Sequence, residues 1–147
     1  MKTLGLDIGD KTIGIAVSDD AGVISFPRET YRRISRRDDE RYITDLLKRE
    51  AISRIVYGLP YNMDGSLGPQ AEKTGKFMDR LNHRLRHDPE IGDIELIASD
   101  ERLTSKMADK AMISQDMRRE TRKQYIDALA ASFILQNYLD RENRRQE

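Results

Sequence analysis

The sequence contains no cysteine in its 147 residues. This absence excludes a disulfide framework and any metal or redox site built from thiolates, and it suits a reducing compartment. Long apolar stretches are also missing, because none approaches the roughly 18 residues that a membrane span requires. The N-terminus leads directly into a strand pattern, without the basic, apolar and small-residue segments of a signal peptide. We therefore expect a cytoplasmic protein that does not enter a membrane.

An excess of charge of either sign is absent as well. The sequence has 26 basic and 26 acidic residues, although charged residues make up 35% of it. With no global field to attract a polyanion, binding of nucleic acid must depend on local basic clusters. One cluster precedes the first predicted helix and contains Arg32, Arg33, Arg36 and Arg37. A second contains Arg118, Arg119, Arg122 and Lys123. The second cluster either contacts phosphates or forms a solvated face that nearby acids balance.

The length predicts a single domain over residues 1–147 with a sizeable core. Three short apolar stretches open the sequence, at 4–8, at 13–18 and at 23–27 with its flanks, and turn-forming residues separate them. Stretches this close can pair only as antiparallel hairpins, because a parallel crossover needs a dozen or more residues.

Strands and helices then alternate. We predict strands at 53–58 and 94–98, and helices at 38–51, 69–86, 103–113 and 122–140, with a polar connection at 114–122 and a charged tail that frays from about residue 140. The helix at 69–86 is expected to face inward with Ala71, Phe77, Met78, Leu81 and Leu85. This order predicts an α/β fold with a five-stranded mixed sheet, an antiparallel meander followed by parallel strands, and helices on both faces.

Three acidic residues are the candidate catalytic and metal-binding residues: Asp7, Glu101 and Asp127. Asp7 lies in the first, glycine-punctuated strand, Glu101 follows the fifth strand, and Asp127 lies early in the last helix. They can meet if the two strands are neighbours and the helix packs across their ends. Mg²⁺ and Mn²⁺ favour carboxylate oxygens, and two such ions can clamp the attacking and leaving oxygens of a phosphate diester. The pattern therefore predicts a two-metal-ion nuclease site.

Each acid also has a structural interpretation. Asp7 can initiate the turn at Gly9, Glu101 can favour a helix N-terminus, and Asp127 can reach water from the edge of an apolar stripe. The candidates for a fourth ligand are Asp10, Asp64 and Asp100, and each of them also suits a turn or a cap.

Four motifs resemble those of the YqgF/RuvX family of RNase H-like nucleases. They lie at 7–19 (DIGDKTIGIAVSD), 58–65 (GLPYNMDG), 100–105 (DERLTS) and 126–131 (IDALAA), in the order found in the family and across nearly the whole chain. The resemblance implies an RNase H-like fold and metal-dependent nuclease activity. Family members are described as Holliday junction resolvases, by likeness to RuvC, or as nucleases that mature the 5′ end of 16S rRNA. By motif position, the family's acidic residues fall on Asp7, Glu101 and Asp127.

One departure from the family is visible at residues 9–12. Relatives often have Gly-Thr-Lys-Arg there, whereas this chain has Gly-Asp-Lys-Thr, which removes an arginine from the turn and adds an acid. The residues predicted to contact substrate are Lys11, Asn62, Ser66, Arg102, Arg122 and Lys123. The loop that carries Asn62 and Ser66 either offers groups to phosphate at a helix N-terminus or serves only as a tight connection.

The predicted reaction is hydrolysis of a nucleic-acid phosphodiester with Mg²⁺ or Mn²⁺, in 5′-end maturation of pre-16S rRNA or, alternatively, on a four-way DNA junction. No residue chooses between structured RNA and branched DNA as the partner, and a homodimer would suit a two-fold junction. Two other classes stay open. A phosphotransferase or ATPase of the actin–hexokinase type needs two such domains, and a non-catalytic nucleic-acid-binding protein would keep the same fold. His83 and His87 lie four residues apart on one predicted helix, a spacing that can bind zinc. The glutamate of the zinc-protease motif is missing, so we do not expect a zinc site there.

Overall fold

The computed structural model describes residues 1–100 and 119–145, with side chains in the last helix described from residue 125 onward. The elements in chain order are β1 (Thr3–Ile8), β2 (Thr12–Ser18), β3 (Ser25–Arg32), α1 (Arg36–Arg49), β4 (Arg54–Leu59), α2 (Pro69–Arg86), β5 (Glu95–Asp100) and α4 (Arg119–Arg145). The helix predicted at 103–113 lies outside the described residues, as do Glu101 and Arg102. Every helix in the described ranges is too short or too polar to cross a membrane.

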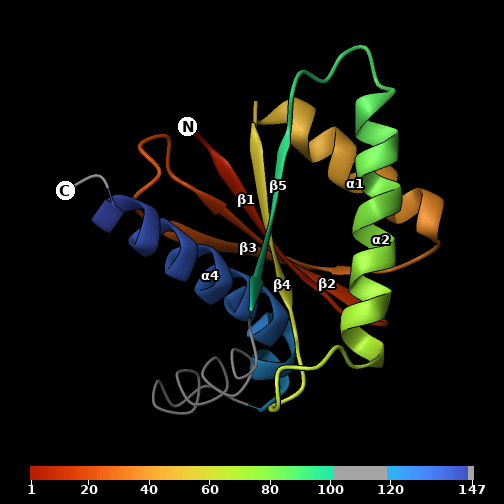
Figure 1. Ribbon diagram of the computed structural model, residues 1–147, viewed down its shortest axis with the longest axis vertical. Coiled ribbons are helices and arrows are strands. Elements are labelled where there is room, and N and C mark those ends of the chain that lie inside the picture. The colour runs from red at the N-terminus through yellow and green to blue at the C-terminus, as the bar shows by residue number, and fades with distance from the viewer. Residues whose placement is uncertain (101–118, 146–147) are drawn as a thin grey trace.

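The five strands form one mixed sheet in the order β3-β2-β1-β4-β5 (Figure 1). The β1–β2 and β2–β3 pairs are antiparallel, and the β1–β4 and β4–β5 pairs are parallel. The predicted meander and parallel strands are therefore confirmed. The condition that β1 and β5 be direct neighbours for the three acids to meet is not fulfilled, because β4 lies between them. β2 and β4 occupy the two edges of β1, and β5 pairs with the outer edge of β4.

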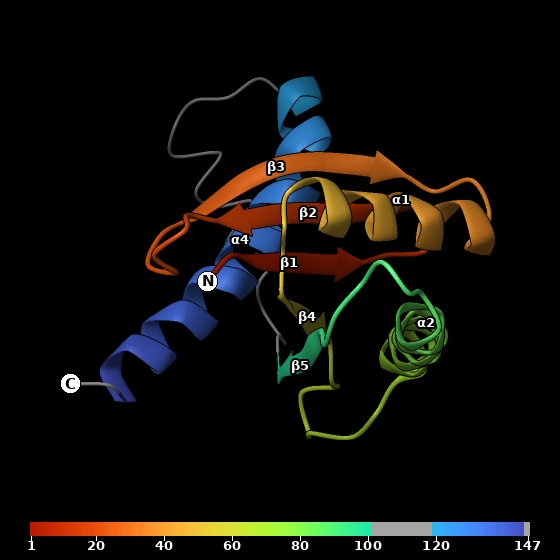
Figure 2. The same cartoon turned by 90° about the horizontal axis from the view of Figure 1, so that it is seen from above.

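The two faces of the sheet differ in the size of their side chains. One face of β1 presents Leu4, Leu6 and Ile8 to a large apolar core that includes side chains of α1 and α2. The other face is built from small residues and packs against α4 through Ala131, Ile134 and Leu135. Figure 2 shows α4 on one side of the sheet and α1 and α2 on the other. Helices on both faces are therefore confirmed.

Local sequence explains the first two helices. The Ser35 hydroxyl accepts a hydrogen bond from the Asp38 backbone N–H, which caps α1, and acidic residues in the first turn favour the helix N-terminus. α2 begins with Pro69 in its first turn, where the missing N–H costs nothing. All five side chains predicted to face inward from α2 are buried: Ala71, Phe77, Met78, Leu81 and Leu85.

The bounds of two elements differ most from those predicted. β3 spans Ser25–Arg32, so it starts within the predicted stretch 23–27 and ends well beyond it, because the polar residues after Pro27 continue to pair with β2 past a bulge between Ile15 and Ala16. α4 begins at Arg119 and ends at Arg145, beyond the predicted 122–140. Its C-terminal turns are held to β5 and to the β2–β3 turn, since Arg141 donates to the Ser99 hydroxyl at 3.1 Å and Asn143 donates to the Gly22 carbonyl at 3.3 Å.

Candidate active site

Asp7 lies near the carboxyl end of β1, the central strand of the sheet. Side chains alternate between faces along a strand, and Gly5, two residues earlier, faces α4: a Cβ built on Gly5 would lie 2.8 Å from the Leu135 Cβ. The half-buried Asp7 side chain therefore projects towards the α4 face. Its partner across the β1–β2 pair is Gly14.

Asp127, in α4, approaches the sheet at Gly14, the strand partner of Asp7. A Cβ built on Gly14 would lie 1.9 Å from the Asp127 carbonyl oxygen, so the helix backbone rests directly on β2 at this residue. The Thr12 hydroxyl donates a hydrogen bond of 2.6 Å to Asp127 Oδ2. Gly14 thus lies between the two acids, paired with Asp7 in the sheet and covered by the main chain of Asp127. The structure brings two of the three predicted carboxylates to one face at one end of the sheet.

The third predicted carboxylate, Glu101, lies outside the described residues, but the strand leading to it is placed. Leu6 pairs with Tyr57 and Tyr57 with Ala98, so continuing this register puts Ser99 level with Asp7. At a strand spacing of about 4.8 Å, β5 lies about 10 Å from β1. Gly58 of β4 occupies the row between them and carries no side chain. β5 thus ends at Asp100, close to the level of Asp7.

The three candidates for a fourth ligand have different surroundings. Lys73 of α2 donates to Asp10 at 3.3 Å. Asp64 accepts hydrogen bonds from the backbone N–H and the hydroxyl of Ser66, at 2.9 and 2.6 Å, which is the turn role expected as its alternative. Asp100 is exposed at the end of β5.

The predicted contact residues of the 58–66 loop bind one another. Asn62 donates from its side-chain amide to the Ser66 hydroxyl at 3.1 Å and from its backbone to the Ser66 carbonyl at 2.9 Å. Gly65 adopts a positive φ of 88° in this turn. The loop is therefore an ordered connection at the carboxyl end of β4, and both side chains stay exposed. The backbones of Arg122 and Lys123 lie in α4, and their side chains are among those not described.

Sequence reasoning missed the role of Arg33, which it placed in a basic cluster. The Arg33 guanidinium donates to the Gly9 carbonyl and to Asp39 Oδ2, each at 2.8 Å, and it lies over the Phe77 ring at 5.0 Å from the centroid. The Arg33 backbone N–H also donates to the Lys11 carbonyl at 2.9 Å. Arg33 therefore holds the β1–β2 turn that follows Asp7, an arrangement that no local pattern signals. The same is true of Thr12, whose bond to Asp127 joins residues 115 positions apart.

Metal-binding groups are sparse in the described ranges. Within residues 1–100 and 119–145, no three His, Cys, Asp or Glu side chains gather closely enough to hold an ion, and of the predicted trio these ranges include only Asp7 and Asp127. The His83 and His87 rings lie 4.3 Å apart, and His87 Nδ1 lies 2.8 Å from the His83 carbonyl oxygen. That contact engages one ring nitrogen within the helix itself.

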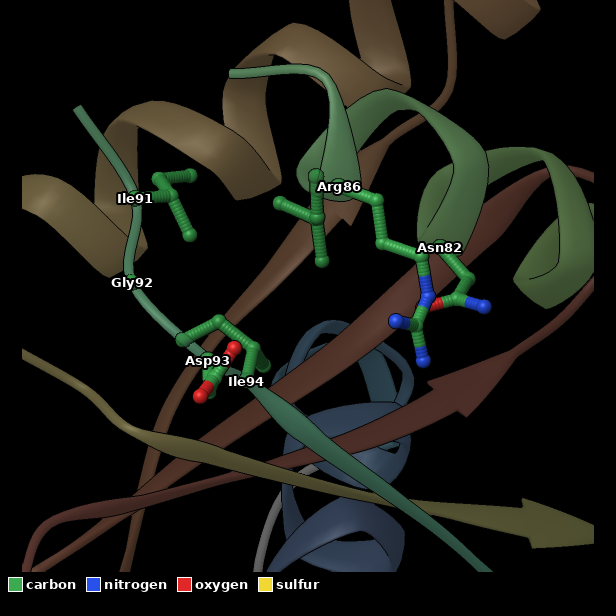
Figure 3. A pocket seen from close by; sticks show the side chains of 7 residues that line it. Asn82, Arg86, Ile91, Gly92, Asp93 and Ile94 are labelled. Carbon is green, nitrogen blue, oxygen red and sulfur yellow. The ribbon is translucent and has the colours of Figure 1, made fainter. Parts of the chain in front are cut away.

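A hollow of about 440 Å³ lies between the end of α2 and the segment that enters β5 (Figure 3). Its lining includes Asn82, Arg86, Ile91, Asp93 and Ile94. It lies near the amino ends of the parallel strands β4 and β5, whereas Asp7 lies near the carboxyl end of β1. With Asp93 as its single acid, it does not contribute to a cluster of carboxylates.

Comparison with known proteins identifies close relatives. A family model described as RuvX, Holliday junction resolvase, matches residues 1–141. A protein of Halalkalibacterium halodurans is 46% identical over 144 residues, which cover 97% of this chain and 98% of that protein. One of Clostridium tetani is 44% identical over 140 residues, which cover 95% of this chain and 96% of that protein. Both are named as proposed pre-16S rRNA nucleases.

Two solved structures share the fold. The Thermus thermophilus RuvC structure in complex with Holliday junction substrate aligns with a TM-score of 0.60 at 13% identity, over 97% of this chain and 96% of that one. The complex of Fowlpox virus resolvase with substrate Holliday junction DNA aligns with a TM-score of 0.57 at 15% identity, over 97% of this chain and 99% of that one. At such low identities the likeness shows the fold alone, and it confirms the RNase H-like fold.

Proposed function

The chain belongs to the RuvX family, and on that premise we propose that it is a metal-dependent nuclease that hydrolyses phosphodiester bonds of nucleic acid. The family expected from the four motifs is thereby confirmed. The names of its relatives and its resolvase fold both support a phosphodiester hydrolase. The observation that carries the proposed site is the position of Asp7 and Asp127 on either side of Gly14.

The donors at this site fit a hard divalent cation. Asp7 and Asp127 supply carboxylate oxygens, which Mg²⁺ and Mn²⁺ prefer, and Gly58 beside Asp7 adds no side chain to the space between β1 and β5. Glu101 is the proposed third ligand because it directly follows β5, whose end lies level with Asp7. Bound ions of this kind would neutralise charge on the phosphodiester and lower the pKa of a bound water.

The chain's own residues prepare the geometry. Thr12 orients Asp127 through a hydrogen bond to Oδ2, and the contact at Gly14 fixes the height of α4 above β2. Arg33 holds the turn after Asp7. Positions fixed before substrate binds reduce the entropic cost of reaching the reactive geometry. Water breaks a P–O bond of the diester, and by analogy with RNase H-like enzymes the products carry a 5′ phosphate and a 3′ hydroxyl.

We favour precursor 16S rRNA as the substrate, cleaved during maturation of its 5′ end. Relatives that are 44% and 46% identical carry this activity in their names, whereas the junction-bound resolvases are only 13% and 15% identical. The second candidate substrate is a four-way DNA junction, which the family description and the junction complexes favour. A resolvase would act as a homodimer, because a junction has two-fold symmetry.

The test is cleavage of labelled precursor rRNA and of a labelled four-way DNA junction, with Mn²⁺, with Mg²⁺ and with chelator. Specific cleavage of the RNA that requires the metal and is lost in Asp7→Asn supports the proposal. Cleavage of the junction alone would favour the second substrate. Cleavage that survives Asp7→Asn would assign the activity to another site or to a contaminant. Binding without cleavage under every condition would favour a non-catalytic binding protein, and binding of Mg-ATP would revive a phosphotransferase.

A further inference from the structure

Two adjoining hollows gather basic side chains on the side of the sheet that faces α1 and α2. The first, of about 220 Å³, lies between the carboxyl end of β1 and α2, and its basic residues are Arg33, Arg36, Lys73, Lys76 and Arg80. The second, of about 480 Å³, lies along the β1–β2 turn and the segment that enters α1, and it adds Lys11 and Arg32. The two share Asp10, Arg33 and Arg36 in their linings, so they adjoin one another, and we term the pair the basic groove.

The charge of the basic groove contrasts with that of the whole chain. The chain has equal numbers of basic and acidic residues, whereas the groove is lined by seven basic side chains and two acids, Asp10 and Asp39. Asp39 is only 1% exposed and is bound to Arg33, so it presents little charge to solvent. A local excess of positive charge of this kind attracts a polyanion even when the net charge is zero.

Several of these cations are available to a ligand. Lys73 pairs with Asp10 at 3.3 Å, but both side chains are more than 60% exposed, so the pair contributes little stability. Lys11, Arg32, Lys76 and Arg80 are exposed and have no salt bridge within the described residues. Among the described residues, these charges therefore lie close together without ion pairs to the rest of the fold.

The spacing of the cations suits a chain of phosphates better than a single anion. Lys73, Lys76 and Arg80 follow one another at three and four positions, so they lie on one face of α2 and span about 10 Å along it. Lys11 and Arg32 extend the row past the β1–β2 turn. One small anion would contact two or three of these groups, whereas a nucleic-acid backbone presents a phosphate to each part of the row.

The basic groove begins next to the candidate active site. Asp10 and Lys11 line the groove and lie three and four residues after Asp7, across the turn that Arg33 holds. We propose that the basic groove binds the phosphodiester backbone of the substrate to one side of the scissile bond, which rests on the nuclease function proposed above. The substrate then crosses the carboxyl edge of the sheet, with Asp7 and Asp127 on the α4 side and the groove on the α2 side.

The experiment compares Lys76→Gln/Arg80→Gln with a matched control, Arg144→Gln/Arg145→Gln, which removes the same charge at the far end of α4. Glutamine keeps helix propensity close to that of lysine and arginine. Binding of a fluorescent RNA stem–loop and of a fluorescent four-way DNA junction is measured without divalent cations, from about 50 to 200 mM salt, the range over which phosphate contacts change affinity strongly. Thermal melts verify that all variants fold.

We expect the groove variant to bind about tenfold more weakly at low salt, with the slope of log affinity against log salt smaller by about 2 in magnitude, because two phosphate contacts are lost. The control is expected to bind like wild type. Equal affinities and slopes for the groove variant and wild type would overturn the proposal, and so would an equal loss in the control. Asp7→Asn separates the two proposals, because loss of cleavage in that variant with binding retained concerns the active site alone. A different outcome is that the wild-type protein binds nucleic acid but never cleaves it, while the groove variant binds more weakly than the wild type. That outcome would support the basic groove and refute the nuclease activity.

Discussion

The carbonyl oxygen of Asp127 occupies the place where a side chain on Gly14 would start, 1.9 Å from an ideal Cβ. Because Gly14 is also the strand partner of Asp7, one residue without a side chain sets how closely the helical acid approaches the strand acid. The geometry of the proposed site therefore depends on Gly14 as much as on the carboxylates themselves.

Gly14→Ala is expected to force α4 away from β2. Overpacking of a well-packed contact costs about 1–3 kcal/mol, and here the opposing atom is main chain, which cannot rotate away. We expect a loss of that size in urea denaturation and cleavage reduced at least tenfold. Gly75→Ala in α2 is the control, since a Cβ there meets nothing within 4 Å. The control should gain about 0.5–1 kcal/mol from helix propensity. Unchanged stability in Gly14→Ala would contradict the observed contact.

Thr12→Val tests the hydrogen bond that orients Asp127. Valine keeps the branched shape suited to β2 but removes the donor to Asp127 Oδ2. We expect a fall in kcat of about tenfold with a stability change of about 1 kcal/mol, typical for a single hydrogen bond. Thr30→Val is the matched control on β3, because the buried Thr30 hydroxyl has no hydrogen-bond partner within the described ranges. Equal kinetics for the two variants would argue against a positioning role for Thr12.

Asp127→Asn is expected to abolish metal-dependent cleavage while the fold survives. The amide is nearly the same size as the carboxylate and can still accept from Thr12, but it lacks the charge that a hard cation requires. Calorimetry with Mn²⁺ and a single-turnover cleavage assay would measure the two losses. Asp140→Asn, on an exposed position of the same helix, is the control and should leave both unchanged. Wild-type Mn²⁺ affinity in Asp127→Asn would exclude this residue as a ligand.

Arg33→Met is expected to destabilise the protein by about 3 kcal/mol, because it leaves the buried Asp39 carboxylate without its cation. The bond to the Gly9 carbonyl is lost as well, so the turn after Asp7 should loosen. Chemical denaturation of Arg33→Met and of Arg32→Met, its exposed neighbour, gives the comparison. Arg32→Met should stay within about 0.5 kcal/mol of wild type. A similar small change in Arg33→Met would show that Asp39 does not depend on this ion pair.

The stacked pair Tyr31 and Tyr42 predicts a pH dependence of stability. Burial and hydrogen bonds to Asp39 and Glu29 raise the pKa of each phenol to about 12. An unfolded tyrosine ionises near pH 10, so the stabilising contribution of the pair is complete below pH 10 and declines as the pH rises towards 12. Absorbance titration should show phenolate developing near pH 12 in the folded protein, and this step should shrink in Tyr31→Phe/Tyr42→Phe. Complete ionisation of all six tyrosines by pH 10.5 would contradict the prediction.

Local patterns predicted those elements whose residues follow a strict period. The apolar spacing and Pro69 placed α2 at 69–86, the observed bounds. β3 was placed wrongly because it is an edge strand, where exposed polar residues such as Arg28 and Arg32 hide the alternation. The order of the strands depends on which edge of β1 stays open after the hairpins form, which no single segment encodes.

The residues of the candidate site also fall into two groups, those that sequence motifs predict and those that only the folded chain reveals. Asp7 and Asp127 were identified through motifs, and their roles stay predictions that the variants above will test. Thr12 and Arg33 act through partners far away in sequence, so only the folded chain reveals them. The spacing of the basic residues from Lys73 to Arg80 places them on one face of a helix. That this face lines a groove depends on the β1–β2 turn lying beside α2, which only the folded chain reveals.

The path of the chain also has a consequence for its biosynthesis. A ribosome completes all five strands before it translates α4, which covers the sheet through residues such as Ala131 and Leu135. Until that helix emerges, Ala16, Val56 and Ile97 lack the cover that α4 gives them, so the nascent protein is vulnerable to aggregation. Because Asp127 arrives with the same helix, a prematurely terminated polypeptide would possess the sheet but lack one carboxylate of the proposed site.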